Sequence, residues 1–275
     1  MTARGSRRSG CFIDVVRKSE GAIVCRTKII TQMLGALGAT MISTAVTAAD
    51  IQLLGSTAMR EALDELVPLF EKASGHKVVM NLYPAASLMV KVKEGAPADL
   101  VLTTPDNVDM LMKDGKLVPN TRVDFVHSRV GVAVKAGAPK PDISTPDALK
   151  AAFLAAKSIG ISRGPSGVHL MSAMARIGIA DQVKAKMVQP ELGVRVGTLV
   201  AKGEAEIGVQ QIGELLPIPG IDYVGPLPKE LQTVIVYALA RHVNAKQWPA
   251  AEALVKFLTA PERAPLLKKI GLDPA

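Results

Sequence analysis

Short apolar segments alternate along most of the chain with segments whose apolar residues recur every three or four positions. Residues 51–54 are almost continuously apolar and predict a short buried strand. Between residues 59 and 70 the apolar positions fall at steps of four, three and four, which predicts an amphipathic helix ending near Gly75. A Gly-Ser-Thr turn at residues 55–57 joins the two elements.

The same alternation continues to the end of the chain. Further strands are expected at 78–82, 130–134, 159–162, 194–197, 207–210, 221–224 and 234–240, and one more strand is expected to end at residue 102. Helices are expected at 106–115, 169–176, 198–202, 249–258 and 261–269. A further short helix is expected to begin at Ser87, and another is expected to end at residue 156. Strands that alternate with helices are typical of parallel βαβ units, so the pattern predicts an α/β fold.

Three turns occupy equivalent positions, each after a strand and before a helix: residues 55–57, 86–87 and 165–167. In open α/β sheets, ligands bind beyond the carboxyl ends of strands. We expect a first lobe formed by residues 50–128 and 232–275 and a second lobe formed by 129–231. The first two turns would then face the third across a cleft.

Hydroxyl groups and free backbone N–H groups meet at such turns, and the start of a helix attracts anions. The sequence therefore favours a dehydrated oxyanion or carboxylate as ligand. A simpler interpretation of Ser56 and Ser166 is that each only caps its helix. Gln210 and Gln211 alternate at a strand end, so we expect at most one of them to face the cleft.

The formal net charge of +8 is concentrated at the N-terminus, where residues 1–49 account for +5. No basic run interleaved with aromatic residues follows, so nucleic-acid binding is not expected. Arg26 and Lys28 precede an apolar stretch and the small residues 47–49, which is the pattern of a secretory signal. We therefore expect residues 1–49 to be a leader that directs the protein to the periplasm.

Both cysteines, Cys11 and Cys25, lie in this leader, so the expected mature chain has no disulfide and no thiolate site. The histidines outside it, at 76, 127, 169 and 242, have no metal-like spacing, and we predict neither a metal ion nor a cofactor.

Four segments resemble the periplasmic molybdate-binding proteins and the wider group of type II solute-binding proteins of ABC importers. They are Gly-Ser-Thr-Ala-Met-Arg-Glu-Ala-Leu from residue 55, Lys-Glu-Gly-Ala-Pro-Ala-Asp-Leu from residue 93, Pro-Ser-Gly from residue 165 and Gly-Glu-Ala-Glu-Ile-Gly from residue 203. The resemblance implies a two-lobed fold, a small oxyanion in the cleft, an ABC permease as partner and a monomer. The ligand-binding residues it implies, together with those flanking the turns, are Ser56, Thr57, Ala86, Ser87, Arg163, Ser166, Gly167 and Gln211.

Departures from the molybdate-binding pattern leave a second interpretation open. The second turn has one serine rather than several, Gln211 stands where a tyrosine is common, and Arg163 and His169 flank the third turn. A guanidinium binds planar carboxylates through two parallel hydrogen bonds. Some relatives on this fold resemble aconitate isomerases, and the candidate catalytic residues for that chemistry are His169, Glu214 and Arg163. The simpler interpretation of His169 is an ordinary packed or surface histidine, that of Arg163 is a solvated loop charge, and that of Glu214 is a carboxylate at a helix start.

Overall fold

The computed structural model describes residues 48–191 and 193–275. Residues 1–47 of the predicted leader, which spans residues 1–49, lie outside the described residues, and so do both cysteines. Among the described residues, no helix has the length and apolar character needed to cross a membrane.

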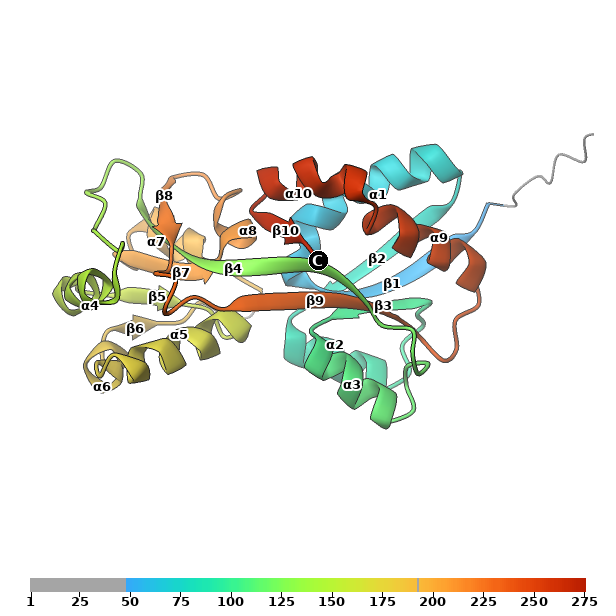
Figure 1. Cartoon of the computed structure of the whole chain (residues 1–275), viewed down its shortest axis with the longest axis horizontal. Coiled ribbons are helices and arrows are strands. Elements are labelled where there is room, and N and C mark those ends of the chain that lie inside the picture. The colour runs from blue at the N-terminus through green and yellow to red at the C-terminus, as the bar shows by residue number, and fades with distance from the viewer. Residues whose placement is uncertain (1–47, 192) are drawn as a thin grey trace, which may run out of the picture. The chain divides into compact units, whose positions relative to one another are not determined.

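The first lobe has a small sheet with helices on both faces (Figure 1). Its strands are β1 (Asp50–Ser56), β2 (Lys77–Tyr83), β3 (Leu100–Thr103) and β10 (Leu272–Pro274). Its helices are α1 (Arg60–Ser74), α2 (Ala85–Lys93), α3 (Pro105–Lys113), α9 (Trp248–Leu258) and α10 (Ala264–Lys269), with single turns of 3₁₀-helix at Thr57–Met59 and Pro261–Arg263. Strand β1 pairs in parallel with both β2 and β3, as the βαβ pattern predicts.

The second lobe repeats this organisation. Its strands are β5 (Ile159–Ile161), β6 (Met187–Val188), β7 (Ile207–Gln211) and β8 (Ile221–Pro226). Its helices are α4 (Pro146–Ala155), α5 (Pro165–Arg176), α6 (Ala180–Lys184), α7 (Val196–Lys202) and α8 (Ile212–Leu215). Strand β5 pairs in parallel with β6 and β7.

Two strands, β4 (Val123–Lys135) and β9 (Val234–Arg241), connect the lobes and run antiparallel to each other (Figure 1). The first part of β4 pairs with β9 and β10, and its second part pairs with β7 and β8. Strand β9 also pairs antiparallel with β3, which gives the order β2-β1-β3-β9-β4-β7-β5-β6. The expected lobe boundaries at residues 128/129 and 231/232 stay a prediction; the first of them falls inside β4.

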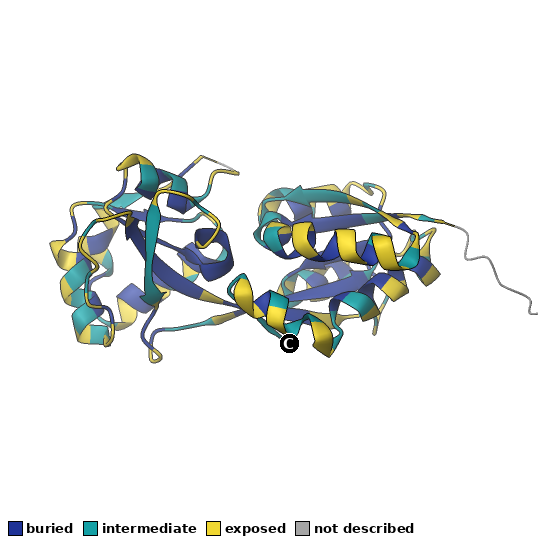
Figure 2. Ribbon diagram, turned by 90° about the horizontal axis from the view of Figure 1, so that it is seen from above, coloured by how far each residue is buried: buried dark blue, intermediate teal, exposed yellow. Residues whose placement is uncertain are grey.

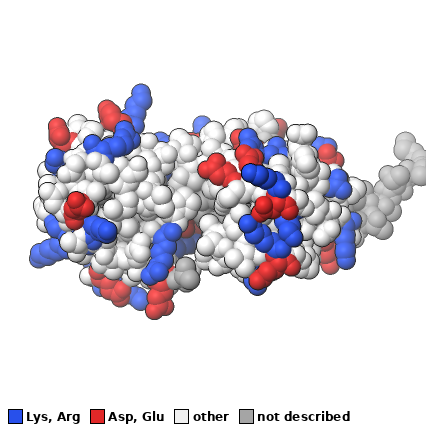
Figure 3. All heavy atoms as spheres, turned by 90° about the horizontal axis from the view of Figure 1, so that it is seen from below, with Lys and Arg blue, Asp and Glu red and all other residues white. Residues whose placement is uncertain are grey.

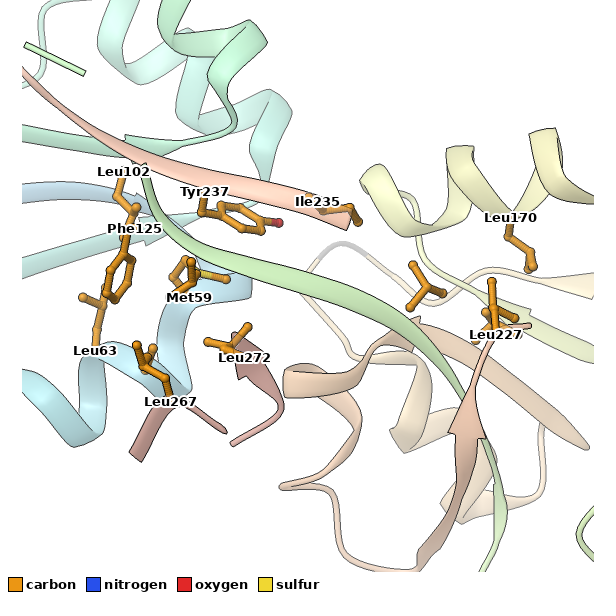
Figure 4. Packing of buried hydrophobic residues seen from close by; sticks show 14 of the residues in the cluster. Met59, Leu63, Leu102, Phe125, Leu170, Leu227, Ile235, Tyr237, Leu267 and Leu272 are labelled. Atoms are coloured by element: carbon orange, nitrogen blue, oxygen red, sulfur yellow. The ribbon is translucent and has the colours of Figure 1, made fainter. Parts of the chain in front are cut away.

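The core lies between the strands and the inner faces of the helices. Figure 2 shows the strands mostly buried, whereas the helices expose their outer faces. Close to the crossing strands, Met59, Leu63, Phe125 and Tyr237 pack together and are all at most 1% exposed (Figure 4). The apolar positions that predicted α1 therefore pack against the two strands that hold the lobes together.

Charged side chains are distributed over the surface. On the face shown in Figure 3, Lys and Arg side chains lie among Asp and Glu side chains, with broad uncharged areas between them.

The structure corrects several predicted elements. The strand expected at 194–197 is wrong, because α7 begins at Val196. The side chain of Val196 packs over Gly160 and Gly208, where no Cβ intervenes, so tertiary packing overrides the β-propensity of valine. Helix α2 begins at Ala85, two residues before the expected Ser87. The short elements α6, β6 and β10 were not predicted at all.

Candidate functional site

The three turns singled out in the sequence all line one cavity of about 400 Å³. The first turn contributes Ser56 and Thr57, the second contributes Pro84 to Ala86, and the third contributes Arg163 to Pro165. The cavity is therefore lined by residues of both lobes, and Tyr237 of the crossing strand β9 completes the lining.

Ser56 is the last residue of β1 and is 5% exposed. Its backbone is extended and its Oγ accepts a hydrogen bond from the Ala58 N–H at 3.3 Å, so it caps the 3₁₀ turn before α1. Because Ser56 also lines the cavity, its capping role and a ligand-binding role are compatible. Its hydroxyl proton is not used by this cap.

The second turn offers mainly backbone and methyl groups. Pro84 precedes α2, and Ala85 and Ala86 line the cavity with it. Ser87, the third residue of α2, is half-buried and is not among the lining residues. The first turn of α2 therefore faces the cavity with free N–H groups rather than with a serine hydroxyl.

The third turn places only part of the predicted set in the lining. Arg163 lines the cavity, and its Nε donates to the Pro190 carbonyl at 3.0 Å. Ser166 is 1% exposed and its Oγ lies 2.8 Å from the Oγ of Ser162, which does line the cavity. Ser166 and Gly167 lie behind the lining.

Gly167 is required at its position because of a close backbone approach. A Cβ atom there would lie 1.9 Å from the Ser162 carbonyl oxygen, far inside van der Waals contact. The Pro-Ser-Gly sequence therefore packs the start of α5 against the end of β5 and so positions Arg163.

His169 lies away from the cavity lining. Its Nε2 donates to the Leu231 carbonyl at 2.7 Å, which ties α5 to the segment before β9. The structure thus separates His169 from Arg163 and Glu214, the two other residues considered for catalysis, which both line the cavity.

A connected group of polar side chains occupies the floor of the cavity. Gln211 Nε2 donates to the Tyr237 hydroxyl at 3.0 Å and to Glu214 Oε2 at 3.2 Å. Gln210 Oε1 accepts from the Val196 N–H at 2.8 Å. The expectation that at most one of the two glutamines faces the cleft is wrong, because both line the cavity. Gln211 is at once the last residue of β7 and the residue that precedes α8, so the chain turns from strand to helix there.

Glu214 is the titratable group that this environment perturbs most clearly near neutral pH. It is 9% exposed, and its burial raises the pKa of the carboxyl group to about 7. The Arg195 guanidinium lowers this pKa, the Glu61 carboxylate raises it and a hydrogen bond with Gln210 lowers it, each by less than burial does. Burial also raises the pKa of the Tyr237 hydroxyl, and the Glu214 carboxylate adds to that shift.

Several lining residues were missed in the sequence analysis: Arg60, Ser162, Arg195 and Tyr237. Arg195 was hidden by the wrong strand at 194–197. Tyr237 is a single polar aromatic in the apolar run of β9, and only the pairing of that strand with β4 brings it to the cavity. Ser162 directly follows β5 and ends the strand expected at 159–162, and its position there was the one available signal.

The described residues, 48–191 and 193–275, contain no group of three or more His, Cys, Asp or Glu side chains placed to hold a metal ion. The lining instead combines hydroxyls, amides, backbone N–H groups and guanidinium groups. These groups stabilise an anion through hydrogen bonds and charge.

Comparisons with known proteins agree on the fold. The aconitate isomerase of a Pseudomonas species is 33% identical, in a match that covers 90% of this chain and 97% of that protein. The molybdate-binding protein ModA of Azotobacter vinelandii is 26% identical, covering 88% and 97%. Among solved structures, the periplasmic molybdate-binding protein of Azotobacter vinelandii superimposes with a TM-score of 0.69 at 19% identity, covering 81% of this chain and 98% of that one. The sulfate-binding protein SubI of Mycobacterium tuberculosis gives 0.69 at 20% identity, covering 82% and 87%.

The strand order, the two connecting strands and these structural matches define a two-lobed periplasmic binding protein fold of type II, with a ligand cleft between the lobes. A family model described as "Bacterial extracellular solute-binding protein" matches residues 51–273. The chain belongs to this family.

Proposed function

We propose that the protein captures a small oxyanion in the cleft and delivers it to the permease of an ABC importer. In this proposal the protein acts as a monomer in the periplasm, after export directed by residues 1–49. The family match and the leader-like pattern of basic and apolar residues support this location. The molybdate- and sulfate-binding relatives support the class of ligand.

The observation that carries the proposal is the convergence of anion-binding groups from both lobes on one cavity. Ser56 and Thr57 come from the first lobe, and Arg163 and Ser162 come from the second. A ligand that contacts both sides stabilises the closed arrangement of the lobes over the open one.

A second candidate function, isomerisation of a tricarboxylate such as aconitate, is favoured by one specific observation. Glu214 lines the cavity, and its pKa of about 7 lets it exchange a proton near neutral pH. Moving a proton between two carbon atoms of such a substrate requires a base to remove it and an acid to return it. One carboxyl group with this pKa can perform both steps in turn. The aconitate isomerase relative supports this candidate.

A thermal-shift panel tests both candidates on the wild-type protein. Binding raises the melting temperature by mass action, with about 2.7 kcal/mol of added stability at a ligand concentration of 100 Kd. The importer proposal expects a shift with at least one of molybdate, tungstate, sulfate, citrate or the aconitates. If none of them shifts the melting temperature, the proposed capture of an oxyanion is wrong.

The same protein is then incubated with cis- and trans-aconitate, and the two isomers are followed by proton NMR. Stabilisation without interconversion supports a binding protein. Interconversion that is lost in Glu214→Gln and kept in Glu204→Gln supports the isomerase. Glu204 is a suitable control because it is exposed and does not line the cavity.

A further inference from the structure

One ion pair crosses the cleft from lobe to lobe. Arg195 immediately precedes α7 in the second lobe, and its Nη2 donates a hydrogen bond to Oε1 of Glu61 in the first turn of α1. The two side chains are 21% and 17% exposed, and Arg195 lines the cavity.

The pair is incompletely satisfied. The second oxygen of Glu61, Oε2, is buried and accepts no hydrogen bond from the described residues. A buried carboxylate oxygen without a donor is costly, so a contact that served only to hold the lobes together would be expected to satisfy both oxygens. Glu61 instead gains one partner, and that partner is a cation of the cavity lining.

A second carboxyl group lies near this guanidinium. Glu214 lies close enough that both Arg195 and Glu61 affect its ionisation. Arg195 thus faces one carboxylate directly and a second nearby, whereas Arg163 of the same lining hydrogen-bonds a backbone carbonyl. Acidic groups of the protein itself therefore occupy the surroundings of Arg195.

We propose that, without ligand, the Glu61 carboxylate binds the Arg195 guanidinium where a carboxylate of the ligand would bind. On entry, the ligand carboxylate displaces that of Glu61 from this guanidinium. This inference rests on the proposed capture of an anion and narrows its class to ligands that carry a carboxylate. The planar fork of a guanidinium matches a carboxylate, and Arg195 both holds one carboxylate, that of Glu61, and lines the cavity.

The exchange has a consequence for protons. A carboxylate bound to Arg195 brings a negative charge close to Glu214, with Arg60, Arg163 and Arg195 as the cations of the lining and Glu191 as its other acid. The Tyr237 hydroxyl, on the side of β9, stays neutral because its pKa is raised. A negative charge close to a carboxyl group disfavours its ionised form. Binding is therefore coupled to proton uptake at Glu214, whose pKa is already raised to about 7.

Isothermal titration with trans-aconitate, citrate and molybdate tests the exchange at pH 7.5, in two buffers of different ionisation enthalpy. The variants are Glu61→Gln, which removes the competing charge, and Arg195→Lys, which keeps the charge and loses the fork. Asp109→Asn is the matched control, because it removes the same charge from an exposed pair with Arg122 outside the cavity. Circular dichroism and melting curves establish that each variant is folded.

We expect Glu61→Gln to bind the carboxylates about fivefold more tightly, because the ligand no longer has to break a partly exposed ion pair. Arg195→Lys should bind them at least about tenfold more weakly, because bidentate geometry is lost. Asp109→Asn should match the wild type. Wild-type binding should take up as much as one proton, and Glu61→Gln should take up less.

Three results would overturn the exchange: weaker binding by Glu61→Gln, unchanged binding by Arg195→Lys, or wild-type binding without proton uptake. Binding of molybdate without binding of either carboxylate also overturns it and leaves the broader oxyanion proposal standing. If the wild type binds none of the three anions, both proposals are wrong.

Discussion

At the scale of single residues, Glu214 links stability to pH in a direction opposite to that of an ordinary surface carboxylate. Its pKa rises from 4.5 to about 7 on folding, so the folded state holds the proton more tightly than the unfolded state. Folding stability therefore falls as the pH rises from about 4.5 to about 7 and changes little beyond. A shift of this size corresponds to about 3 kcal/mol.

Glu214→Gln should remove this dependence, because the amide has nearly the same shape and does not ionise. We expect the free energy of unfolding of the variant to exceed that of the wild type by up to about 3 kcal/mol at pH 8, and to be close to it at pH 4.5. Urea denaturation at both pH values measures the two differences, and the wild type's other titrating groups cancel in the comparison. An equal difference at the two pH values would contradict the raised pKa.

Residue-level prediction from the sequence worked where a side chain acts on its immediate neighbours. The strand–turn–helix pattern around Ser56 located its cap and its place in the lining, because both follow from residues within a few positions. Arg195 and Tyr237 reach the cavity through contacts with residues 134 and 26 positions away, respectively. No local pattern carries that information.

At the scale of elements, the third turn depends on the absence of a side chain at Gly167. Gly167→Ala would place a Cβ atom 1.9 Å from the Ser162 carbonyl oxygen, so β5 and α5 must separate. We expect a loss of about 2–3 kcal/mol of unfolding free energy, as for other overpacked sites, together with weaker anion binding because Arg163 is displaced. Urea denaturation and the thermal-shift panel measure the two effects.

Gly164→Ala is the matched control in the same turn. Its Cβ would meet only the Ser162 Oγ, at 3.7 Å, and its φ of −93° suits any residue. This variant should lose less than about 1 kcal/mol, as most tolerated substitutions do. Equal losses in the two variants would show that close packing at Gly167 does not govern the turn.

The sequence located this turn and most strands and helices because their signals are local: apolar periodicity, capping residues and glycines. It was wrong at residues 194–197, where valines with high β-propensity belong to a loop and a helix. That segment packs against β5 and β7, and the space above Gly160 and Gly208 accommodates Val196. Long-range packing of this kind overrides the local preference of a segment for one type of secondary structure.

At the scale of the whole molecule, the segment that most specifically marks the family resemblance stabilises the first lobe and lies outside the cavity. Asp99, the end of the Gly-Ala-Pro-Ala-Asp segment, is 2% exposed. Its Oδ2 accepts from the Gln52 N–H at 2.8 Å, and its Oδ1 accepts from the N–H groups of Lys246 and Gln247 at 2.7 and 2.8 Å. One carboxylate thus joins β1, β3 and the start of α9, which are far apart in the sequence.

Asp99→Asn should therefore destabilise the fold without altering the cleft. An amide retains one acceptor oxygen and turns its NH₂ group toward a buried N–H, so we expect a loss of about 2–4 kcal/mol of unfolding free energy. Asp114→Asn, which breaks an exposed pair with Lys93, should lose less than about 1 kcal/mol. Because Asp99 does not line the cavity, the Kd for a bound anion should match the wild type below the melting transition. A change in Kd at unchanged stability would instead assign Asp99 to ligand binding, and would contradict its role in stabilising the first lobe.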